Sequence, residues 1–172
     1  MNVDVGSFCF LRDNYFHDFP DVNLMQNKET ISGQAHNRPC FFAFKDKDTQ
    51  IHWLIPVSSQ VEKYKKIYNK NMAKYKNCDT IVFGELANKE TVFLIQNMCP
   101  ATPIYIKNEY LDKNEQPIRI PNHIATNLIQ KARRVLALQR QGVKLIFPDV
   151  LSIERKLLNA EDCGLCAHTA QT

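Results

Sequence analysis

The feature that most constrains the fold is a pair of apolar segments joined by a short polar connection. Residues 38–44 read RPCFFAF, residues 51–57 read IHWLIPV, and the connection begins with KDKDT at residues 45–49. Aromatic and β-branched side chains favour strands, and short polar connections join antiparallel neighbours. We therefore predict a β-hairpin over residues 38–57.

Further short segments extend this pattern over the chain. We predict strands at residues 7–11, 80–83, 91–95 and 104–106, and helices at residues 61–76, 122–142 and 151–158. Short strands in this number, interrupted by one helix and closed by others, predict an α+β domain. A strongly bent sheet or partial barrel would bury such strands.

Length and composition indicate a soluble protein of one domain. The chain has 172 residues, of which 44% are hydrophobic and 23% are charged. We assign residues 1–158 to a single domain and residues 159–172 to a flexible C-terminal tail. The sequence shows neither a signal peptide nor an apolar run of membrane-spanning length, so we expect a cytoplasmic protein without a membrane partner.

Six cysteines could form disulfides, but we expect reduced thiols in this setting. Cys40, Cys78 and Cys99 lie in or beside apolar segments, where a thiol packs as a small apolar group. Cys163 and Cys166, with the nearby His168, look like half of a zinc site. A structural zinc ion needs four ligands and no second pair completes this set, so we predict no metal and no cofactor.

The predicted helix at residues 61–76 carries an unusual concentration of positive charge. The net charge of the chain is only +4, yet six lysines and no acid lie between residues 63 and 76. Four lysines recur at three- and four-residue spacing and share one face: Lys63, Lys66, Lys70 and Lys74. A second stripe beside them consists of Tyr64, Tyr68, Met72 and Tyr75. The two stripes are either a solvated face beside a core-packing stripe, or a surface that holds a phosphate backbone and stacks on bases.

Ser58 and Ser59 lie where the hairpin strand ends and this helix begins. Ser59 precedes Glu62 by three residues, which predicts a capping box at the helix N-terminus. The same helix end is also a possible anion site, because its free N–H groups, the two hydroxyls and Lys63 would converge there. Such an arrangement can stabilise the charge of a phosphoryl-transfer transition state.

Two residues before the hairpin could also take part in phosphate chemistry. His36 could act as a general acid or base, and the guanidinium of Arg38 could clamp a phosphate. The alternative is that both are ordinary loop residues.

The order of several segments resembles the toxins of type III toxin–antitoxin systems, the ToxN/AbiQ superfamily, and its CptN-like branch in particular. The resemblance covers about residues 8–158. It is carried by FLRDNYFHDFPDVNLMQNK, HNRPCFFAF, HWLIPVSSQVEKYKK, TIVFGE and ETVFLIQNMCPATPIYI, in that order. The strand that opens with Arg38 and Pro39 is also similar to that of the MazF/PemK ribonuclease toxins.

The resemblance implies a compact SH3-like (MazF/PemK-like) antiparallel β-barrel with appended helices. It implies an endoribonuclease toxin that is inhibited by a small structured antitoxin RNA, which the toxin cuts from a repetitive precursor. We expect a pseudoknotted antitoxin RNA, a closed toxin–RNA hetero-oligomer, a cellular or phage RNA substrate and a role in phage defence.

The resemblance also assigns residues. Ser58 and Ser59 match the hydroxyl dyad of the family, whereas Val61 stands where the family often has its lysine. Lys63 is the nearest replacement, followed by Lys65 and Lys66.

We therefore predict metal-independent attack of an RNA 2′-hydroxyl on the adjacent phosphate, which leaves a 2′,3′-cyclic phosphate. The predicted catalytic residues are Ser58, Ser59, Lys63 and His36. The predicted RNA-binding residues are Arg38, Tyr64, Lys65, Lys66, Lys70, Lys74, Arg133 and Arg134. Two alternatives stay open: an RNA-binding module without catalysis, and a MazF-like ribonuclease toxin with a protein antitoxin.

Overall fold

The computed structural model describes the backbone of residues 4–27 and 37–168, and the side chains up to residue 160. The strands are β1 (Phe8–Leu11), β2 (Pro39–Lys45), β3 (His52–Ser58), β4 (Ile81–Leu86), β5 (Lys89–Leu94), β6 (Cys99–Ala101) and β7 (Ile106–Glu109). The helices are α1 (Asp13–Asp18), α2 (Val61–Tyr75), α3 (Asn122–Arg140) and α4 (Val150–His168), with short 3-10 turns at Ile95–Asn97 and Pro103–Tyr105.

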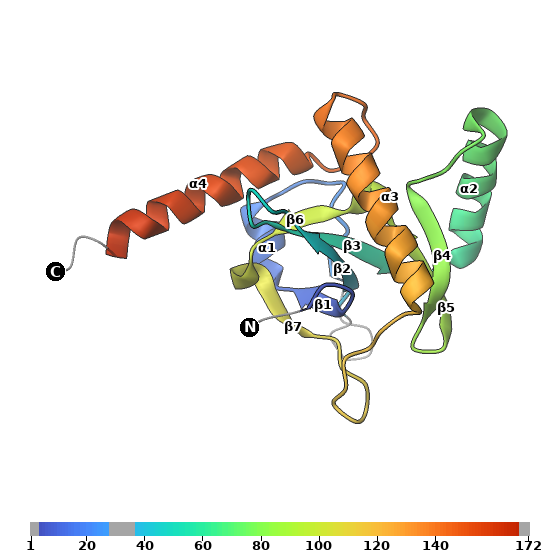
Figure 1. Ribbon diagram of the computed structural model, residues 1–172, viewed down its shortest axis with the longest axis horizontal. Coiled ribbons are helices and arrows are strands. Elements are labelled where there is room, and N and C mark those ends of the chain that lie inside the picture. Colours follow the sequence, from blue (N-terminus) through green and yellow to red (C-terminus); the bar gives the residue numbers. More distant parts are fainter. Residues whose placement is uncertain (1–3, 28–36, 169–172) are drawn as a thin grey trace.

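The seven strands form one antiparallel sheet in the order β4-β5-β3-β2-β1-β7, and β6 also pairs with β3 (Figure 1). β3 changes partner along its length: His52 pairs with Ala101 of β6, whereas Val57 and Ser58 pair with Phe93 and Val92 of β5. The predicted α+β class is confirmed. The predicted SH3-like barrel is not confirmed: the sheet is not closed, because the pairings leave β4 and β7 as separate edges.

The predicted hairpin at residues 38–57 is confirmed as β2 and β3, with Cys40 opposite Pro56 and Lys45 opposite His52. β4 and β5 are longer than predicted and meet at a two-residue turn, Ala87 and Asn88, where both residues have positive φ. The strand predicted at residues 104–106 lies one turn later, since residues 103–105 form a 3-10 turn before β7.

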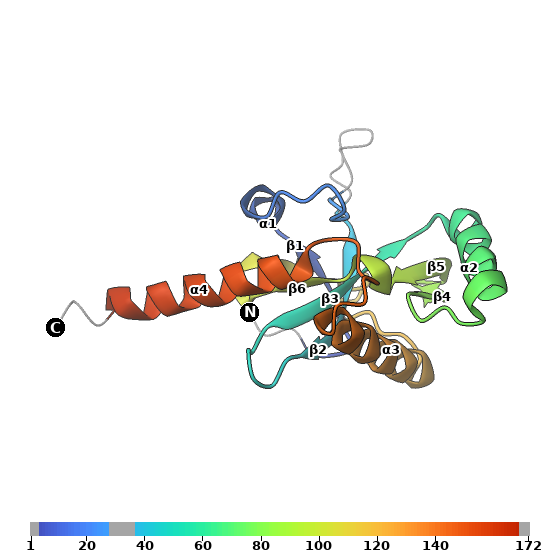
Figure 2. The ribbon, with the colours of Figure 1, turned by 90° about the horizontal axis from the view of Figure 1, so that it is seen from above.

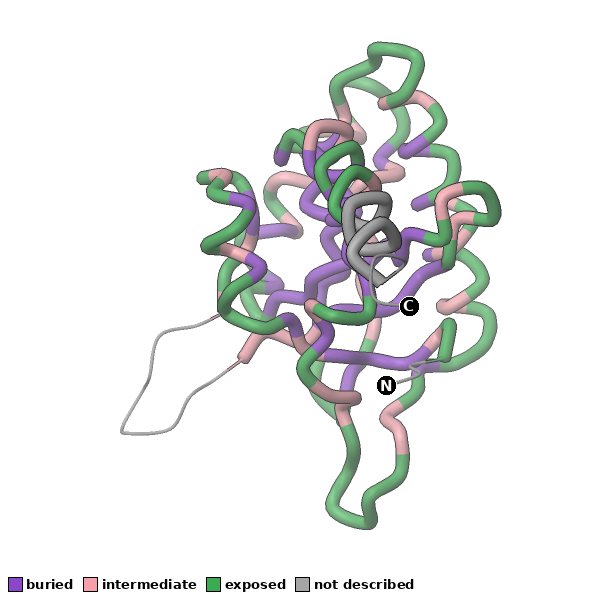
Figure 3. Tube along the Cα trace, turned by 90° about the vertical axis from the view of Figure 1, so that its left-hand side faces the viewer, coloured by how far each residue is buried: buried purple, intermediate pink, exposed green. Residues whose placement is uncertain are grey.

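Buried side chains form two clusters. The larger one lies on the sheet between β1, β2, β3 and α3, and its largest members include Trp53, Phe41 and Phe93. The smaller one joins α2 to β4 and β5 through Val61, Tyr64, Ile81, Val92 and Leu94. Figure 3 shows the buried stretches in the interior and exposed residues along the helices and loops. The smaller cluster therefore fixes α2 against the hairpin of β4 and β5.

α2 and α4 lie at opposite ends of the molecule, and α3 lies between them (Figures 1 and 2). α4 is longer than the predicted helix at residues 151–158 and continues to His168 through most of the segment predicted as a flexible tail. The flexibility of that tail stays a prediction. Within the described ranges, the helices lack the combination of length and apolar composition needed to cross a membrane.

Cys9, Cys40, Cys78 and Cys99 are buried free thiols, so the last three pack as small apolar groups, as predicted. Burial raises the pKa of Cys9 and of Cys99 to about 12, so these thiols stay protonated and unreactive near neutral pH. The side chains of Cys163, Cys166 and His168 lie outside the described residues.

Candidate functional site

A cleft of about 240 Å³ lies where β3 leaves the sheet. Its lining comes from residues 37–39 at the start of β2, residues 57–59 at the end of β3, the hairpin of β4 and β5, and Tyr110. The structure therefore brings Arg38, Ser58 and Ser59 together and adds residues from a distant hairpin. A cleft of this size, lined by two hydroxyls and a guanidinium, can hold a phosphate group.

The two serines of the dyad have different surroundings. Ser58 is buried, and its Oγ accepts a hydrogen bond from the backbone N–H of Gln60 at 3.2 Å. Ser59 is exposed, and no hydrogen bond to its hydroxyl is found among the described residues. Ser58 thus stabilises the turn out of β3, whereas the hydroxyl of Ser59 is available to a ligand.

The predicted capping box is wrong. Gln60, not Ser59, is the N-cap residue of α2, and no side chain of the described residues caps this end. Glu62 pairs instead with Lys65, at 3.0 Å between carboxylate oxygen and Nζ. α2 begins at Val61, as predicted, and without a side-chain cap among the described residues its first N–H groups are free to bind an anion.

Arg38 is anchored beside the dyad. Its Nη1 donates to the carbonyl oxygen of Val57 at 2.8 Å, and its Nε donates to that of Gln26 at 3.2 Å. Burial lowers the pKa of Arg38 below its usual value, but a guanidinium still stays charged near neutral pH. Its remaining N–H groups have no partner among the described residues, which suits them to contact an anion in the cleft.

The lysine stripe of α2 is exposed along its whole length. The tyrosine stripe, in contrast, packs mostly inward: Tyr64 is 7% exposed, and the ring of Tyr68 lies 5.5 Å from that of Phe83. The core-packing interpretation therefore holds for these two residues, and the burial of Tyr64 argues against its predicted role in stacking on bases. Tyr75 remains 62% exposed.

The predicted catalytic lysine is not part of the cleft lining. Lys63 is exposed on the first turn of α2, with its Nζ 5.5 Å from the ring centroid of Tyr64. Lys65 pairs with Glu62 and, at 3.2 Å, with Glu90 of β5; hydrogen bonds to these two carboxylates raise the pKa of Lys65. Neither side chain is placed at the dyad.

The remaining predicted residues lie elsewhere. The guanidinium of Arg133 lies 5.1 Å from the ring centroid of Phe44, and Arg134 pairs with Asp79 at 3.4 Å. Both contacts join α3 to other parts of the chain, and neither residue lines the cleft. His36 lies outside the described residues.

Four polar residues that line the cleft were not predicted from the sequence: Lys89, Glu90, Thr91 and Tyr110. Thr91 is buried and its hydroxyl donates to the carbonyl oxygen of Lys89 at 3.1 Å. In the sequence, only Asn88 indicated a turn between β4 and β5, because asparagine tolerates positive φ. The Ala87 before it also has positive φ but is not a typical turn residue. Without that turn, Lys89 could not be placed near Ser59.

Of three comparisons with known proteins, the comparison with solved structures finds a match. A scan of protein-family models and a search of curated proteins find no match. Among solved structures, AbiQ, a lactococcal anti-phage endoribonuclease of a type III toxin–antitoxin system, matches with a TM-score of 0.66. The alignment covers 91% of this chain and 98% of AbiQ at 16% sequence identity.

The chain has the AbiQ fold. This finding confirms the predicted resemblance to the ToxN/AbiQ superfamily at the level of the fold.

Proposed function

We propose that this protein is an endoribonuclease toxin of a type III toxin–antitoxin system and that its active site is the cleft at Ser58 and Ser59. The observation that carries this proposal is that the dyad and Arg38 line one cleft in a chain with the AbiQ fold. We further propose that the protein acts in the cytoplasm, in defence against phage.

The proposed reaction is an internal transfer at phosphorus. The 2′-oxygen of the RNA attacks the adjacent phosphorus, the bond from phosphorus to the 5′-oxygen breaks, and the products carry a 2′,3′-cyclic phosphate and a 5′-hydroxyl. Ser59 donates a hydrogen bond to a phosphate oxygen, Arg38 neutralises its charge, and the free N–H groups of α2 add to this stabilisation. We keep His36 as the proposed acid or base, and no metal ion is required in this scheme.

The exposed lysines of α2 form the proposed RNA-binding surface, called here the α2 basic face: Lys63, Lys66, Lys70 and Lys74. The N-terminus of α2 directly follows the dyad, so a strand of RNA in the cleft can continue along this face. We propose that a repeat-derived, pseudoknotted antitoxin RNA binds the same face in a closed hetero-oligomer. We also propose that the open sheet is a relative of the SH3-like barrels of MazF and PemK toxins.

The proposal is tested by incubating the purified protein with a pool of random-sequence single-stranded RNA in EDTA. We expect discrete fragments that carry 2′,3′-cyclic phosphate ends. Binding without fragments would favour a non-catalytic RNA-binding module, and fragments only after addition of magnesium would reject the metal-free scheme. Absorbance of the purified toxin complex before and after ribonuclease treatment separates an RNA antitoxin from a protein antitoxin.

Replacing Lys66 and Lys70 together by alanine should weaken RNA binding, because two phosphate contacts are lost. The slope of log affinity against log salt concentration should fall by about 1.4, since each contact with single-stranded nucleic acid contributes about 0.7. Titrations at several salt concentrations measure this slope. The matched control is Lys113→Ala/Lys144→Ala, which removes two exposed lysines outside α2. Equal slopes in both double variants would make the α2 basic face an ordinary solvated surface.

A further inference from the structure

We propose that Lys89, on the hairpin of β4 and β5, supplies the cation of the cleft and contacts the reacting phosphate. This inference rests on the proposed ribonuclease function. Lys89, a residue of the sheet, thereby takes the role of catalytic lysine that the sequence suggested for Lys63 of α2.

Lys89 and Thr91 line the cleft from one face of β5, and Glu90 lines it from the other face. Alternate residues of a strand share a face, so Lys89, Thr91 and Phe93 point one way while Glu90, Val92 and Leu94 point the other way. Phe93 belongs to the larger core and Val92 to the cluster under α2, which fixes the two directions. Lys89 therefore shares its face with the buried cleft residue Thr91.

Ser59 lies close to β5 in the sheet. Val57 pairs with Phe93 and Ser58 with Val92, and Ser59 directly follows this last pair. Ser59 and Lys89 both line the cleft, so the end of β3 and the start of β5 contribute to it from two adjacent segments of chain.

Positions 61 and 65 of α2, the other candidates for the lysine, do not supply a free cation to the cleft. Val61, at the position of the family lysine, is buried in the cluster under α2, so a longer side chain there would point away from the cleft. Lys65 is held by Glu62 and Glu90. Glu90 also lines the cleft, but its carboxylate pairs with Lys65. Lys89 is exposed and has no ion pair among the described residues.

The turn before Lys89 fixes its backbone. Ala87 and Asn88 have φ values of 50° and 61°, the left-handed conformation of a tight two-residue hairpin, and Leu86 pairs directly with Lys89. Lys89 thus projects from a rigid turn. Its ammonium group donates a hydrogen bond to a non-bridging phosphate oxygen and neutralises the charge that develops there, without itself losing a proton.

The test compares Lys89→Met and Lys89→Arg with the wild-type protein on the random-sequence RNA pool in EDTA, under single-turnover conditions with protein in excess. We expect Lys89→Met to lower the cleavage rate about 100-fold, as for loss of one transition-state donor, and to change the RNA dissociation constant less than about 3-fold. Lys89→Arg should restore at least a tenth of the wild-type rate, because the positive charge is kept. Lys113→Met, an exposed lysine outside the cleft, is the control and should cleave as the wild type does.

Three possible results distinguish failure of this inference from failure of the proposed function. If the wild-type protein cuts RNA but Lys89→Met cuts it at a similar rate, the assignment of Lys89 is overturned and the function stands. If Lys63→Met loses far more activity than Lys89→Met, the cation comes from α2 instead. Absence of cleavage by the wild-type protein would contradict the proposed function itself. Circular dichroism melting of each variant confirms that the fold is kept.

Discussion

Replacing Ser59 by alanine is expected to lower the single-turnover rate of RNA cleavage about 100-fold, which is the usual cost of removing one donor to a transition-state oxyanion. Ser59 is exposed and lines the cleft together with Arg38 and Lys89. Its hydroxyl has no hydrogen-bond partner among the described residues, so its loss should leave the free energy of unfolding within about 0.5 kcal/mol of the wild-type value. Cleavage rates and denaturant titrations measure the two effects separately.

Ser58→Ala provides an informative contrast, because the buried Ser58 hydroxyl accepts a hydrogen bond from Gln60. This variant should lose about 1 kcal/mol of unfolding free energy, the typical net contribution of one hydrogen bond. Ser152→Ala on α4, away from the cleft, should change neither quantity. If Ser59→Ala cut RNA as fast as Ser152→Ala, Ser59 would have no role in the reaction.

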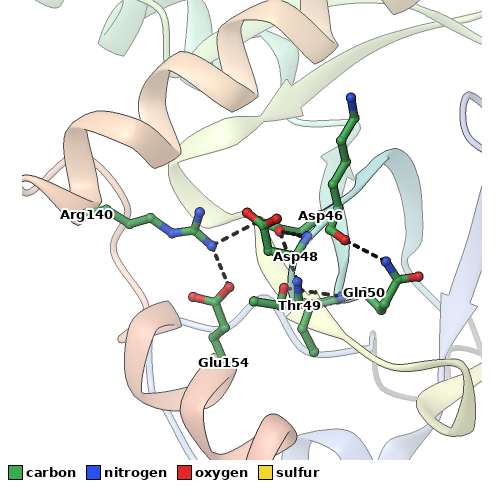
Figure 4. Close-up of polar contacts among 8 residues, drawn as sticks. Asp46, Asp48, Thr49, Gln50, Arg140 and Glu154 are labelled. Atoms are coloured by element: carbon green, nitrogen blue, oxygen red, sulfur yellow. Dashed lines mark hydrogen bonds and ion pairs between the residues drawn. The ribbon is translucent and has the colours of Figure 1, made fainter.

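Replacing Arg140 by methionine is expected to lower the free energy of unfolding by about 3 kcal/mol, because it leaves two largely buried carboxylates without their cation. Figure 4 shows Arg140 between Asp46 of the β2–β3 turn and Glu154 of α4. Its Nη2 lies 3.2 Å from Oδ2 of Asp46 and 2.6 Å from Oε1 of Glu154. The side chains of the two acids are only 13% and 9% exposed. Arg140 thus joins three elements at one point, and urea titration measures its contribution.

The loss of unfolding free energy caused by Arg140→Met should depend on pH. Burial alone would raise the pKa of Asp46, but hydrogen bonds from the backbone N–H groups of Thr49 and Asp48 and from Arg140 lower it below its usual value. A carboxyl group with a lowered folded-state pKa stabilises the fold above its unfolded pKa of about 3.9, and this stabilisation is lost as the pH falls through the folded-state pKa. The difference between wild type and Arg140→Met should therefore be largest near pH 7 and shrink below about pH 4.

Arg119→Met is the matched control for this prediction. Arg119 pairs with Asp4 at 3.6 Å, but their side chains are 46% and 80% exposed. An exposed pair contributes at most about 1 kcal/mol, so this variant should be nearly as stable as the wild type at every pH. A similar loss in both variants would mean that Arg140 acts only as a surface charge.

The sequence predicted those helices and strands that are determined by the residues within and next to them. The β2–β3 hairpin has a polar turn between two apolar strands, and α2 and α3 have helical spacing without internal glycine or proline. The β4–β5 turn was missed because Ala87 adopts a positive φ that few sequences with alanine predict. The change of partner along β3 depends on contacts between distant segments and has no local signal.

The candidate site was predicted only in part for the same reason. Ser58 and Ser59 could be singled out from their place between a strand and a helix, and Arg38 from its place before β2. The lysine nearest in sequence, Lys63, lies on a helix face outside the cleft, whereas Lys89 reaches the cleft from a hairpin about thirty residues away along the chain. Tyr64 illustrates the same limit, because a helical stripe does not reveal which of its members are buried.

The most direct test of the central claim is to map RNA ends produced in EDTA by the wild-type protein and by the Ser58→Ala/Ser59→Ala double variant. A folded double variant can be verified by circular dichroism before the assay. We expect 2′,3′-cyclic phosphate ends at defined positions with the wild-type protein and at least a 100-fold loss of these ends with the double variant, since both hydroxyls line the cleft. Undiminished cleavage by the folded double variant would contradict the account, because the active site would then lie elsewhere.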